Sequence, residues 1–221
     1  MADTVLATMR RGAMPTLPYD AEVEYLESTG TQFIDTGAKK TLGAKIDCTF
    51  SLASTNTKAI FGARTAVGAL DRLMLVAVST AFRFDTRYQS RLGTPDTTSM
   101  FRFQYDGANA TMTNLTTGTT DAVDADIGDA GVLNIALFGV NTDGVVGTMM
   151  LGRMYAFKAW DNSTLVRDYT PVRVGSVGYM YDRVSGQLLG NAGTGAFVVG
   201  PDKQTFTANL GVLAPLKEQE A

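Results

Sequence analysis

Residues 149–171 form the stretch that most constrains how this chain folds. Strand side chains point to opposite faces with a period of two. Applied from residue 150 onward, this period predicts two faces: Met150, Gly152, Met154, Ala156 and Lys158 on one, and Leu151, Arg153, Tyr155, Phe157 and Ala159 on the other. Asp161, Asn162 and Ser163 supply turn chemistry, and Pro171 is expected to stop the returning strand. The stretch therefore predicts a long hairpin through the middle of a two-layer β structure.

The rest of the chain also has the pattern of strands and turns. Residues 28–30 lie between two strand-like segments, 22–26 and 32–35, and predict a hairpin. Further strands are expected at residues 44–52, 59–63, 72–78, 81–85, 101–105, 110–115, 132–140 and 205–213. Residues 116–131 are interpreted as a surface loop, or as a short helix through residues 121–126. Because no stretch has helical apolar spacing, the pattern favours an antiparallel all-β fold.

The length of the chain predicts one main domain with an extension at each end. A single β-sandwich of about 200 to 250 residues is ordinary, and this chain has 221. We divide it into an N-terminal anchoring arm at residues 1–20, a sandwich at 21–202 and a C-terminal extension at 203–221. Terminal extensions are frequent places for subunit contacts, so we expect the arms to hold the domain to neighbouring subunits.

The composition argues against several kinds of chemistry. Without any histidine, the chain lacks the commonest general base and the commonest transition-metal ligand. The single cysteine, Cys48, alternates with Ile46 and Phe50, which predicts a small buried thiol in a strand rather than a nucleophile. A net charge of −3 offers no general attraction to nucleic acid or to acidic lipid, so we expect neither as a partner.

Several motifs resemble one known family. They are the segments 24–37, 60–64, 137–141, 155–171, 178–182 and 191–197, together with Gly200 and Pro201. In these motifs the chain resembles the concanavalin A-like, laminin-G-like module of phage, prophage and gut bacterial surface proteins. The resemblance covers roughly residues 22 to 202. It implies an antiparallel two-sheet jelly-roll sandwich, and it leaves the function open because one fold hosts many activities.

Glycoside hydrolases on this fold use a strand motif of the form E-x-D-x-x-E, whose two carboxylates face one groove. The nearest text here is residues 124–129, in which Asp124 and Asp129 replace the two glutamates, Asp126 matches the central Asp, and Gly128 breaks the strand. An acidic surface loop is the better interpretation, and we expect no enzyme. The same residues fail as a calcium-binding EF-hand loop, because Ile135 stands where a bidentate Glu is needed. No cofactor is expected; a structural calcium ion on Asp and backbone oxygens stays an open alternative without assignable ligands.

Sugar binding needs an aromatic ring that stacks on a pyranose and polar groups that bond its hydroxyls. Two places have this chemistry: Trp160, Asp161 and Asn162 at the hairpin tip, and Arg87, Tyr88 and Arg91 in the segment 86–98. For Trp160 the alternative is a packed residue at the edge of the sandwich. The sequence leaves both interpretations open.

No secretory signal is recognisable in residues 1–20, since residues 12–19 contain two prolines and no long apolar run. The chain also contains no run of about 18 apolar residues, the length that would be needed to span a membrane. The module that the chain resembles is used on outer surfaces, yet no secretion signal is recognisable. A virion protein would combine both features, because it is made in the host cytoplasm and released on lysis.

We therefore expect a non-enzymatic bacteriophage structural protein on the virion surface, decorating the capsid. Its expected partners are the major capsid protein or other virion subunits, sister copies in a homo-oligomer, and host or mucus glycans. The alternative is a carbohydrate-binding adhesin or the receptor-binding module of a tail fibre. A glycoside hydrolase is a third and weaker alternative.

Overall fold

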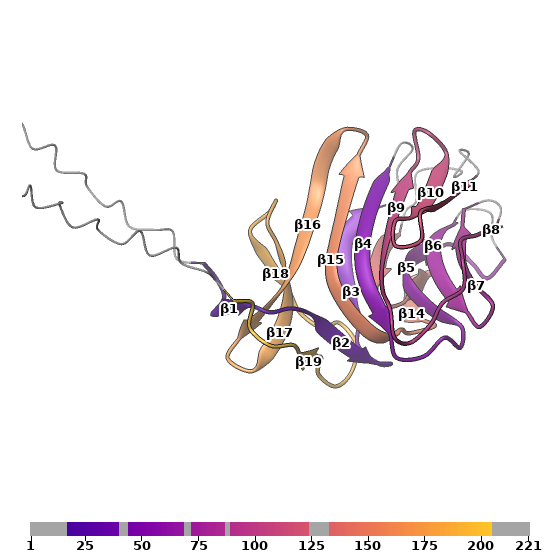
Figure 1. Ribbon diagram of the computed structural model, residues 1–221. Helices are drawn as coiled ribbons and strands as arrows, with labels where there is room; N and C mark the ends of the chain where they lie inside the picture. The colour runs from indigo at the N-terminus through magenta and orange to yellow at the C-terminus, as the bar shows by residue number, and fades with distance from the viewer. Residues whose placement is uncertain (1–16, 40–43, 69–71, 87–88, 124–132, 205–221) are drawn as a thin grey trace, which may run out of the picture.

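The computed structural model describes residues 17–39, 44–68, 72–86, 89–123 and 133–204. These residues form two facing β-sheets and contain no helix (Figure 1). Consequently no helix in these ranges is long and apolar enough to cross a membrane. The all-β, two-sheet jelly-roll sandwich predicted from the sequence is confirmed.

Both sheets are built almost wholly from antiparallel pairs. The large sheet runs in the order β11 (Thr119–Ala122), β10 (Thr111–Asn114), β9 (Met100–Asp106), β4 (Lys45–Leu52), β15 (Leu151–Asp161), β16 (Thr164–Val174), β17 (Val177–Asp182) and β18 (Gln187–Leu189), with β1 (Ala21–Glu22) on β16, β2 (Leu26–Thr29) on β15 and β19 (Val198–Val199) on β2. The small sheet runs β14 (Val145–Gly147), β13 (Val140–Thr142), β5 (Lys58–Arg64), β6 (Arg72–Val78), β7 (Ala81–Asp85) and β8 (Gln89–Arg91), with β12 (Asn134–Leu137) joining β5 to β3 (Ile34–Lys39). Among these strands only β13 and β5 pair in parallel.

An aromatic core joins the two sheets. Phe82 of β7 lies with its ring centroid 4.7 Å from that of Phe101 and 4.8 Å from that of Phe103, both on β9 of the large sheet. Phe61 of β5 meets Phe157 of β15 at 5.6 Å. These edge-to-face contacts between fully buried rings are the favourable arrangement for aromatic pairs. The alternating apolar positions of the strands thus become one continuous interior.

The predicted long hairpin is confirmed, but its two faces are not those of a strict alternation. In β15 the residue Tyr155 is a β-bulge, because Met154 pairs with Phe50 of β4 while Ala156 already pairs with Thr49. Beyond the bulge the alternation changes phase, so Met154 and Phe157 are both buried. The prediction that put Ala156 on the same face as Met154 is therefore wrong.

Three further expectations are corrected. The segment 28–30 makes no hairpin, since β2 pairs with β15 and β19 whereas β3 pairs with β12 of the other sheet. There the buried Gln32 accepts a hydrogen bond from the backbone N–H of Thr29 (2.8 Å) and turns the chain between the sheets. Pro171 does not stop its strand. Pairing between β16 and β15 ends at Tyr169, and beyond it only the short β1 pairs with this edge of β16, so a proline without an N–H is tolerated there. Part of the expected loop 116–131 is a strand, β11, and residues 124–132 lie outside the described ranges.

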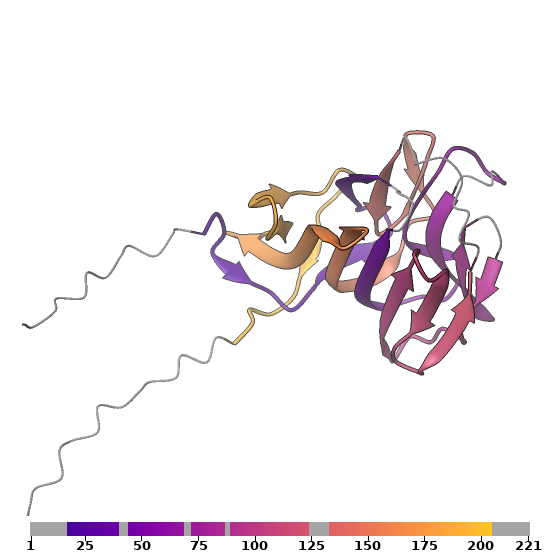
Figure 2. The ribbon, with the colours of Figure 1, turned by 90° about the horizontal axis from the view of Figure 1, so that it is seen from above.

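The two ends of the described chain lie on the same side of the molecule (Figure 2), and backbone hydrogen bonds join the segments that lead to them. The backbone N–H of Lys203 donates to Glu22 (2.8 Å) and that of Glu24 to Pro201 (2.9 Å). Arg173 of β16 donates two hydrogen bonds of 2.7 Å to the Asp202 carboxylate, and Arg183 donates one of 2.7 Å to Glu22. The described ends therefore leave from one corner. Most of the two predicted arms, residues 1–16 and 205–221, lies outside the described residues.

Tyr169 of β16 ties the large sheet to the small one. Its hydroxyl donates a 2.6 Å hydrogen bond to the carbonyl of Thr36 in β3, and its side chain is only 1% exposed. Burial is the main reason that the pKa of Tyr169 is raised well above the ordinary tyrosine value. The phenol therefore stays protonated in the folded protein at pH values where an unfolded tyrosine ionises.

We expect Tyr169→Phe to lower the free energy of unfolding by about 1 kcal/mol at neutral pH, the usual net worth of one hydrogen bond. The pKa of Tyr169 is higher in the folded than in the unfolded protein. The contribution of its hydroxyl to the free energy of unfolding is therefore fully present below the unfolded tyrosine pKa of about 10, and it is lost as the pH rises from there through the folded pKa. Urea unfolding of both proteins between pH 7 and 11 measures this. The difference between them should shrink, and then change sign, above about pH 10; a constant difference would contradict the assignment.

Candidate functional site

The hairpin tip of β15 and β16 carries the tryptophan that the sequence singled out. Trp160 is opposite Lys45 of β4, and Lys45 is opposite Asp106 of β9. On its other side Trp160 is opposite Leu165 of β16. Residues directly opposite in antiparallel strands share a face. Since the neighbouring Ala159 and Ile46 belong to the core, this row lies on the outer face of the large sheet.

The polar members of this row are held in place by short hydrogen bonds. Lys45 Nζ donates to Asp106 Oδ2 at 3.0 Å, and Asn109 Nδ2 donates to the same oxygen at 2.9 Å. Partial burial alone would raise the pKa of Asp106, but these hydrogen bonds bring it below its ordinary value. Asp106 is therefore an ionised acceptor with a fixed orientation. It lies two strands away from Trp160, with Lys45 between them.

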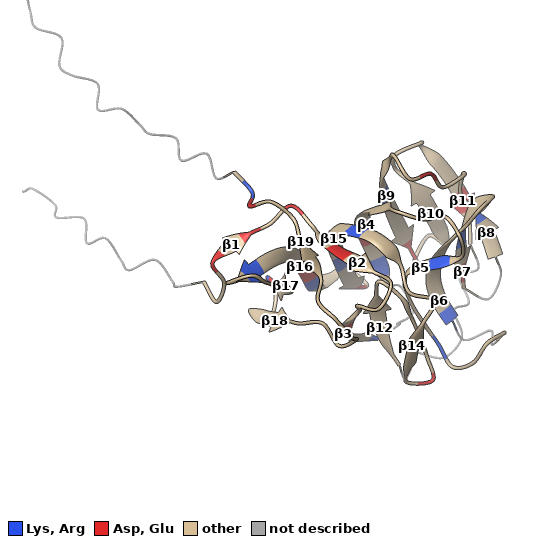
Figure 3. Ribbon diagram, turned by 90° about the horizontal axis from the view of Figure 1, so that it is seen from below, with Lys and Arg blue, Asp and Glu red and all other residues tan. Residues whose placement is uncertain are grey.

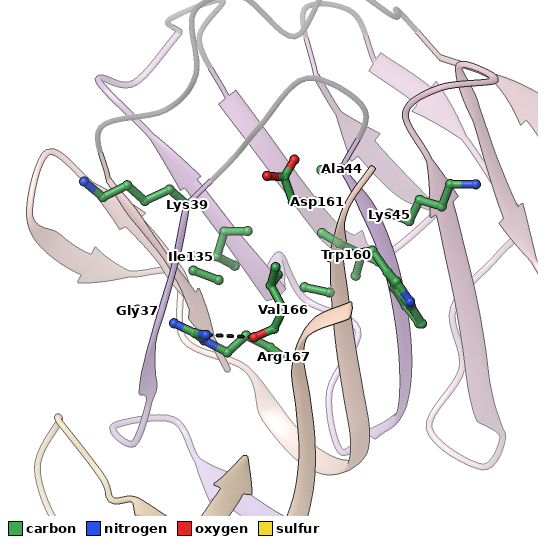
Figure 4. A pocket seen from close by; sticks show the side chains of 12 residues that line it. Gly37, Lys39, Ala44, Lys45, Ile135, Trp160, Asp161, Val166 and Arg167 are labelled. Carbon is green, nitrogen blue, oxygen red and sulfur yellow. Dashed lines mark hydrogen bonds between the residues drawn. The ribbon is translucent and has the colours of Figure 1, made fainter. Parts of the chain in front are cut away.

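Two hollows flank Trp160. One has a volume of about 160 Å³ and is lined by Lys45, Gln104, Asp106 and Trp160, among others. The other, of about 250 Å³, opens between the sheets and has Ile135 and Val166 among its lining residues, with Lys39 and Arg167 beside them. Figure 4 shows the Trp160 ring turned away from Ile135 and Val166, toward the side on which Lys45 of β4 lies. Both volumes lie below the usual range for drug-sized ligands, which suits one sugar ring or substituent rather than a whole oligosaccharide.

The larger hollow is less suited to hydrogen-bond a ligand. Its guanidinium, from Arg167, donates to the carbonyls of Thr36 (3.1 Å) and Val166 (2.7 Å) and is thus engaged with the backbone. Its other charged lining residues, Lys39, Lys45 and Asp161, are at the ends of β3, β4 and β15. The outer-face hollow instead offers a carboxylate, an amide and an ammonium beside the indole. We therefore take the outer-face row as the candidate site.

The structure places the predicted residues in two separate regions. Trp160, Asp161 and Asn162 lie together at the hairpin tip, where Asn162 donates a 3.1 Å hydrogen bond to Asp161. Arg91 lies on β8 of the small sheet, apart from them, and Arg87 and Tyr88 lie outside the described residues. Sequence reasoning missed Lys45, Gln104 and Asp106, which no local motif marks.

The described ranges hold no cluster of side chains suited to bind a metal ion. No three or more acidic or cysteine side chains there converge as metal ligands. Cys48 is fully buried, and burial raises the pKa of its thiol well above the ordinary value, which keeps it unreactive. The acidic residues Asp124, Asp126 and Asp129, considered as a hydrolase motif, lie outside the described residues.

Comparison with solved structures supports the fold. A putative carbohydrate binding protein from Bacteroides ovatus matches 84% of this chain with a TM-score of 0.53 and 10% identity, and the match spans 61% of that protein. The CBM40 module of the Ruminococcus gnavus IT-sialidase, bound to α2,3-sialyllactose, matches 62% of this chain and 89% of its own, with a TM-score of 0.48 and 15% identity. A mutant of the NanB sialidase from Streptococcus pneumoniae matches 81% of this chain and 39% of its own, with a TM-score of 0.45 and 10% identity.

The likeness to the Bacteroides ovatus protein, at a TM-score of 0.53 and 10% identity, supports a shared sandwich fold and assigns no ligand. No protein family model matches the chain, and no curated protein matches it. The fold class thus rests on structure, and the resemblance to the phage and gut bacterial module stays a prediction. The class that the fold defines is that of the all-β proteins built as a two-sheet sandwich.

Because Trp160 is the single tryptophan, its fluorescence reports on this site alone. We expect acrylamide to quench the native protein clearly, though less than the protein unfolded in guanidinium chloride, because the indole is neither buried nor fully exposed. Stern–Volmer plots of both states measure this. Native fluorescence that resists quenching would indicate instead the packed edge residue of the alternative interpretation.

Proposed function

We propose that this chain is a non-catalytic carbohydrate-binding protein whose outer-face row forms the sugar site. The observation that carries the proposal is the row itself, in which the Trp160 indole lies beside the Lys45–Asp106 ion pair on an open sheet face. An indole stacks on the apolar face of a pyranose, while a fixed carboxylate and ammonium accept and donate hydrogen bonds to its hydroxyls. The likeness to structures described as carbohydrate-binding supports this function.

A panel of neutral mono- and oligosaccharides, titrated while the Trp160 fluorescence is followed, tests the proposal. We expect a saturable change in intensity or emission maximum for at least one member. In calorimetry, Trp160→Ala should weaken binding of that sugar by at least about tenfold, as the loss of a central aromatic contact does.

The matched control is Tyr179→Ala, which removes a half-buried aromatic side chain on β17, on a strand away from the site. That variant should bind the sugar as the unchanged protein does. Absence of any response across the panel, or equal affinity after Trp160→Ala in a folded variant, would contradict the proposal.

Display on a virion is our second proposal. It is supported by the resemblance in sequence and by the shared corner from which both described ends leave, which keeps the two outer sheet faces away from an attachment point. In this proposal the segments 1–20 and 203–221 hold the protein to the major capsid protein or to sister copies in a homo-oligomer. Host or mucus glycans would then be the ligands of the displayed face.

Mass spectrometry of purified particles tests this second proposal. We expect the protein in particles at a copy number commensurate with capsid symmetry. We expect deletion of residues 1–16, which keeps the contacts of Tyr19 with Tyr181 and of Asp20 with Arg173, to abolish that incorporation while leaving the thermal unfolding of the domain unchanged. Full occupancy by the truncated protein would remove the anchoring role of the arm. Absence from particles would remove the virion proposal and leave carbohydrate binding untouched.

A further inference from the structure

A second group of aromatic side chains lies on the outer face of the large sheet, nearer the start of β15 than Trp160 is. The rings of Tyr25 and Tyr155 meet edge to face, with their centroids 5.7 Å apart. The Tyr155 hydroxyl lies within hydrogen-bond distance, 3.3 Å, of Ser51 Oγ on β4. Ser51 follows the buried Phe50 and therefore points outward, as the two rings in contact with it and with each other do. We call Tyr25 and Tyr155 the tyrosine pair; the strands β2, β4 and β15, which carry or adjoin it, lie side by side (Figure 3).

The tyrosine pair is held in place without being buried. Arg153 Cζ lies 4.2 Å from the centroid of the Tyr25 ring, in a cation–π contact, and Arg153 Nε donates a 2.6 Å hydrogen bond to Glu27. Both tyrosines are half-buried, and neither belongs to the aromatic core that joins the sheets. Ordered tyrosine and arginine side chains on an open surface are typical of a contact site for a ligand or partner.

Polar side chains fill the outer face between the tyrosine pair and Trp160. Asp47 of β4 accepts two hydrogen bonds from the guanidinium of Arg102, of 3.0 and 2.6 Å. Lys158 of β15 is directly opposite Asp47 and also opposite Asp168, to which its Nζ donates at 3.2 Å. Each of these charges has a partner of opposite sign. The strip between the two aromatic ends therefore offers hydrogen bonds without a net charge.

The separation of the two aromatic ends sets the size of a ligand that contacts both. Trp160 and Tyr155 stand five positions apart on β15. With a rise of about 3.3 Å per residue, somewhat less across the bulge, the two side chains are about 15 Å apart along the strand. A single sugar ring is too small to reach from one to the other, whereas a linear chain of several rings can.

We propose that the ligand of this face is a linear, neutral oligosaccharide that runs along β15 from Trp160 to the tyrosine pair. This inference rests on the proposed function and names the class of sugar that the site takes. The hollow of about 160 Å³ beside Trp160 has room for one ring of the chain. The following rings lie along the open strip, where Lys158 and Asp47 meet their hydroxyls, and a ring further along packs against the tyrosine pair.

Calorimetry with linear glucose oligomers tests the inference. Three series with β-1,4, β-1,3 and α-1,4 linkages, each from the disaccharide to the hexasaccharide, present chains of different shape. In at least one series we expect the affinity to rise by at least about tenfold with length and then to level off, once the chain reaches the tyrosine pair. Galacturonic acid oligomers of the same length should bind no more tightly, because the charges of the strip are already paired.

Variants at the two aromatic ends separate this inference from the proposed function. Tyr155→Ala should remove the gain with chain length and leave the affinity for the disaccharide unchanged, whereas Tyr155→Phe, which keeps the ring, should keep the gain. Trp160→Ala should weaken the binding of every length, and Tyr179→Ala, the matched control on β17, should change none. Should Tyr155→Ala not fold because it alters the bulge, Tyr25→Ala should remove the gain in its place.

Equal affinity for short and long chains would overturn the inference and leave the proposed function intact. The same holds if Tyr155→Ala weakens the disaccharide and the hexasaccharide equally, because a second subsite affects only the chains that reach it. Binding in none of the three series would also overturn it, while the fluorescence panel decides the proposed function separately.

Discussion

The β-bulge at Tyr155 is the constraint on which the arrangement of this protein depends. Without the extra residue, the face that buries Met154 would also bury Ala156, Lys158 and Trp160. With it, Phe157 and Ala159 enter the core and Trp160 moves to the outer face of the large sheet. One inserted residue thus completes the interior and exposes the indole that the proposed function needs.

The bulged strand can take this central place because it has three neighbours. Along one edge β15 pairs with β4, and along the other it pairs first with β2 and then with β16. After Tyr169 the strand β16 leaves the sandwich and carries β17, β1 and both described ends to one corner. The Tyr169 hydroxyl, bonded to Thr36 across the sheets, holds this branching point.

The two outer faces differ in what they offer a ligand. On the large sheet the charges are paired across strands, as in Lys45 with Asp106 and Lys158 with Asp168. An aromatic ring beside such balanced charges suits a neutral sugar. On the small sheet Arg64 is opposite Arg72 and Arg83 is opposite Arg91, and the buried carboxylate of Asp85 lies between these two pairs. The Trp160 row lies at the tip of the β15–β16 hairpin, away from the corner from which the described ends leave (Figure 1), which fits a module held by its ends.

The sequence by itself determined the all-β class, the long hairpin and Trp160 as a candidate, because period-two alternation and turn residues are local properties. Only the tertiary structure decided which residues surround that tryptophan. Lys45 and Asp106 stand 61 positions apart and meet through strand register, and the four arginines meet in the same way. Register follows from packing and bulges, and one extra residue reverses every face beyond it, so no local pattern could have shown these neighbours.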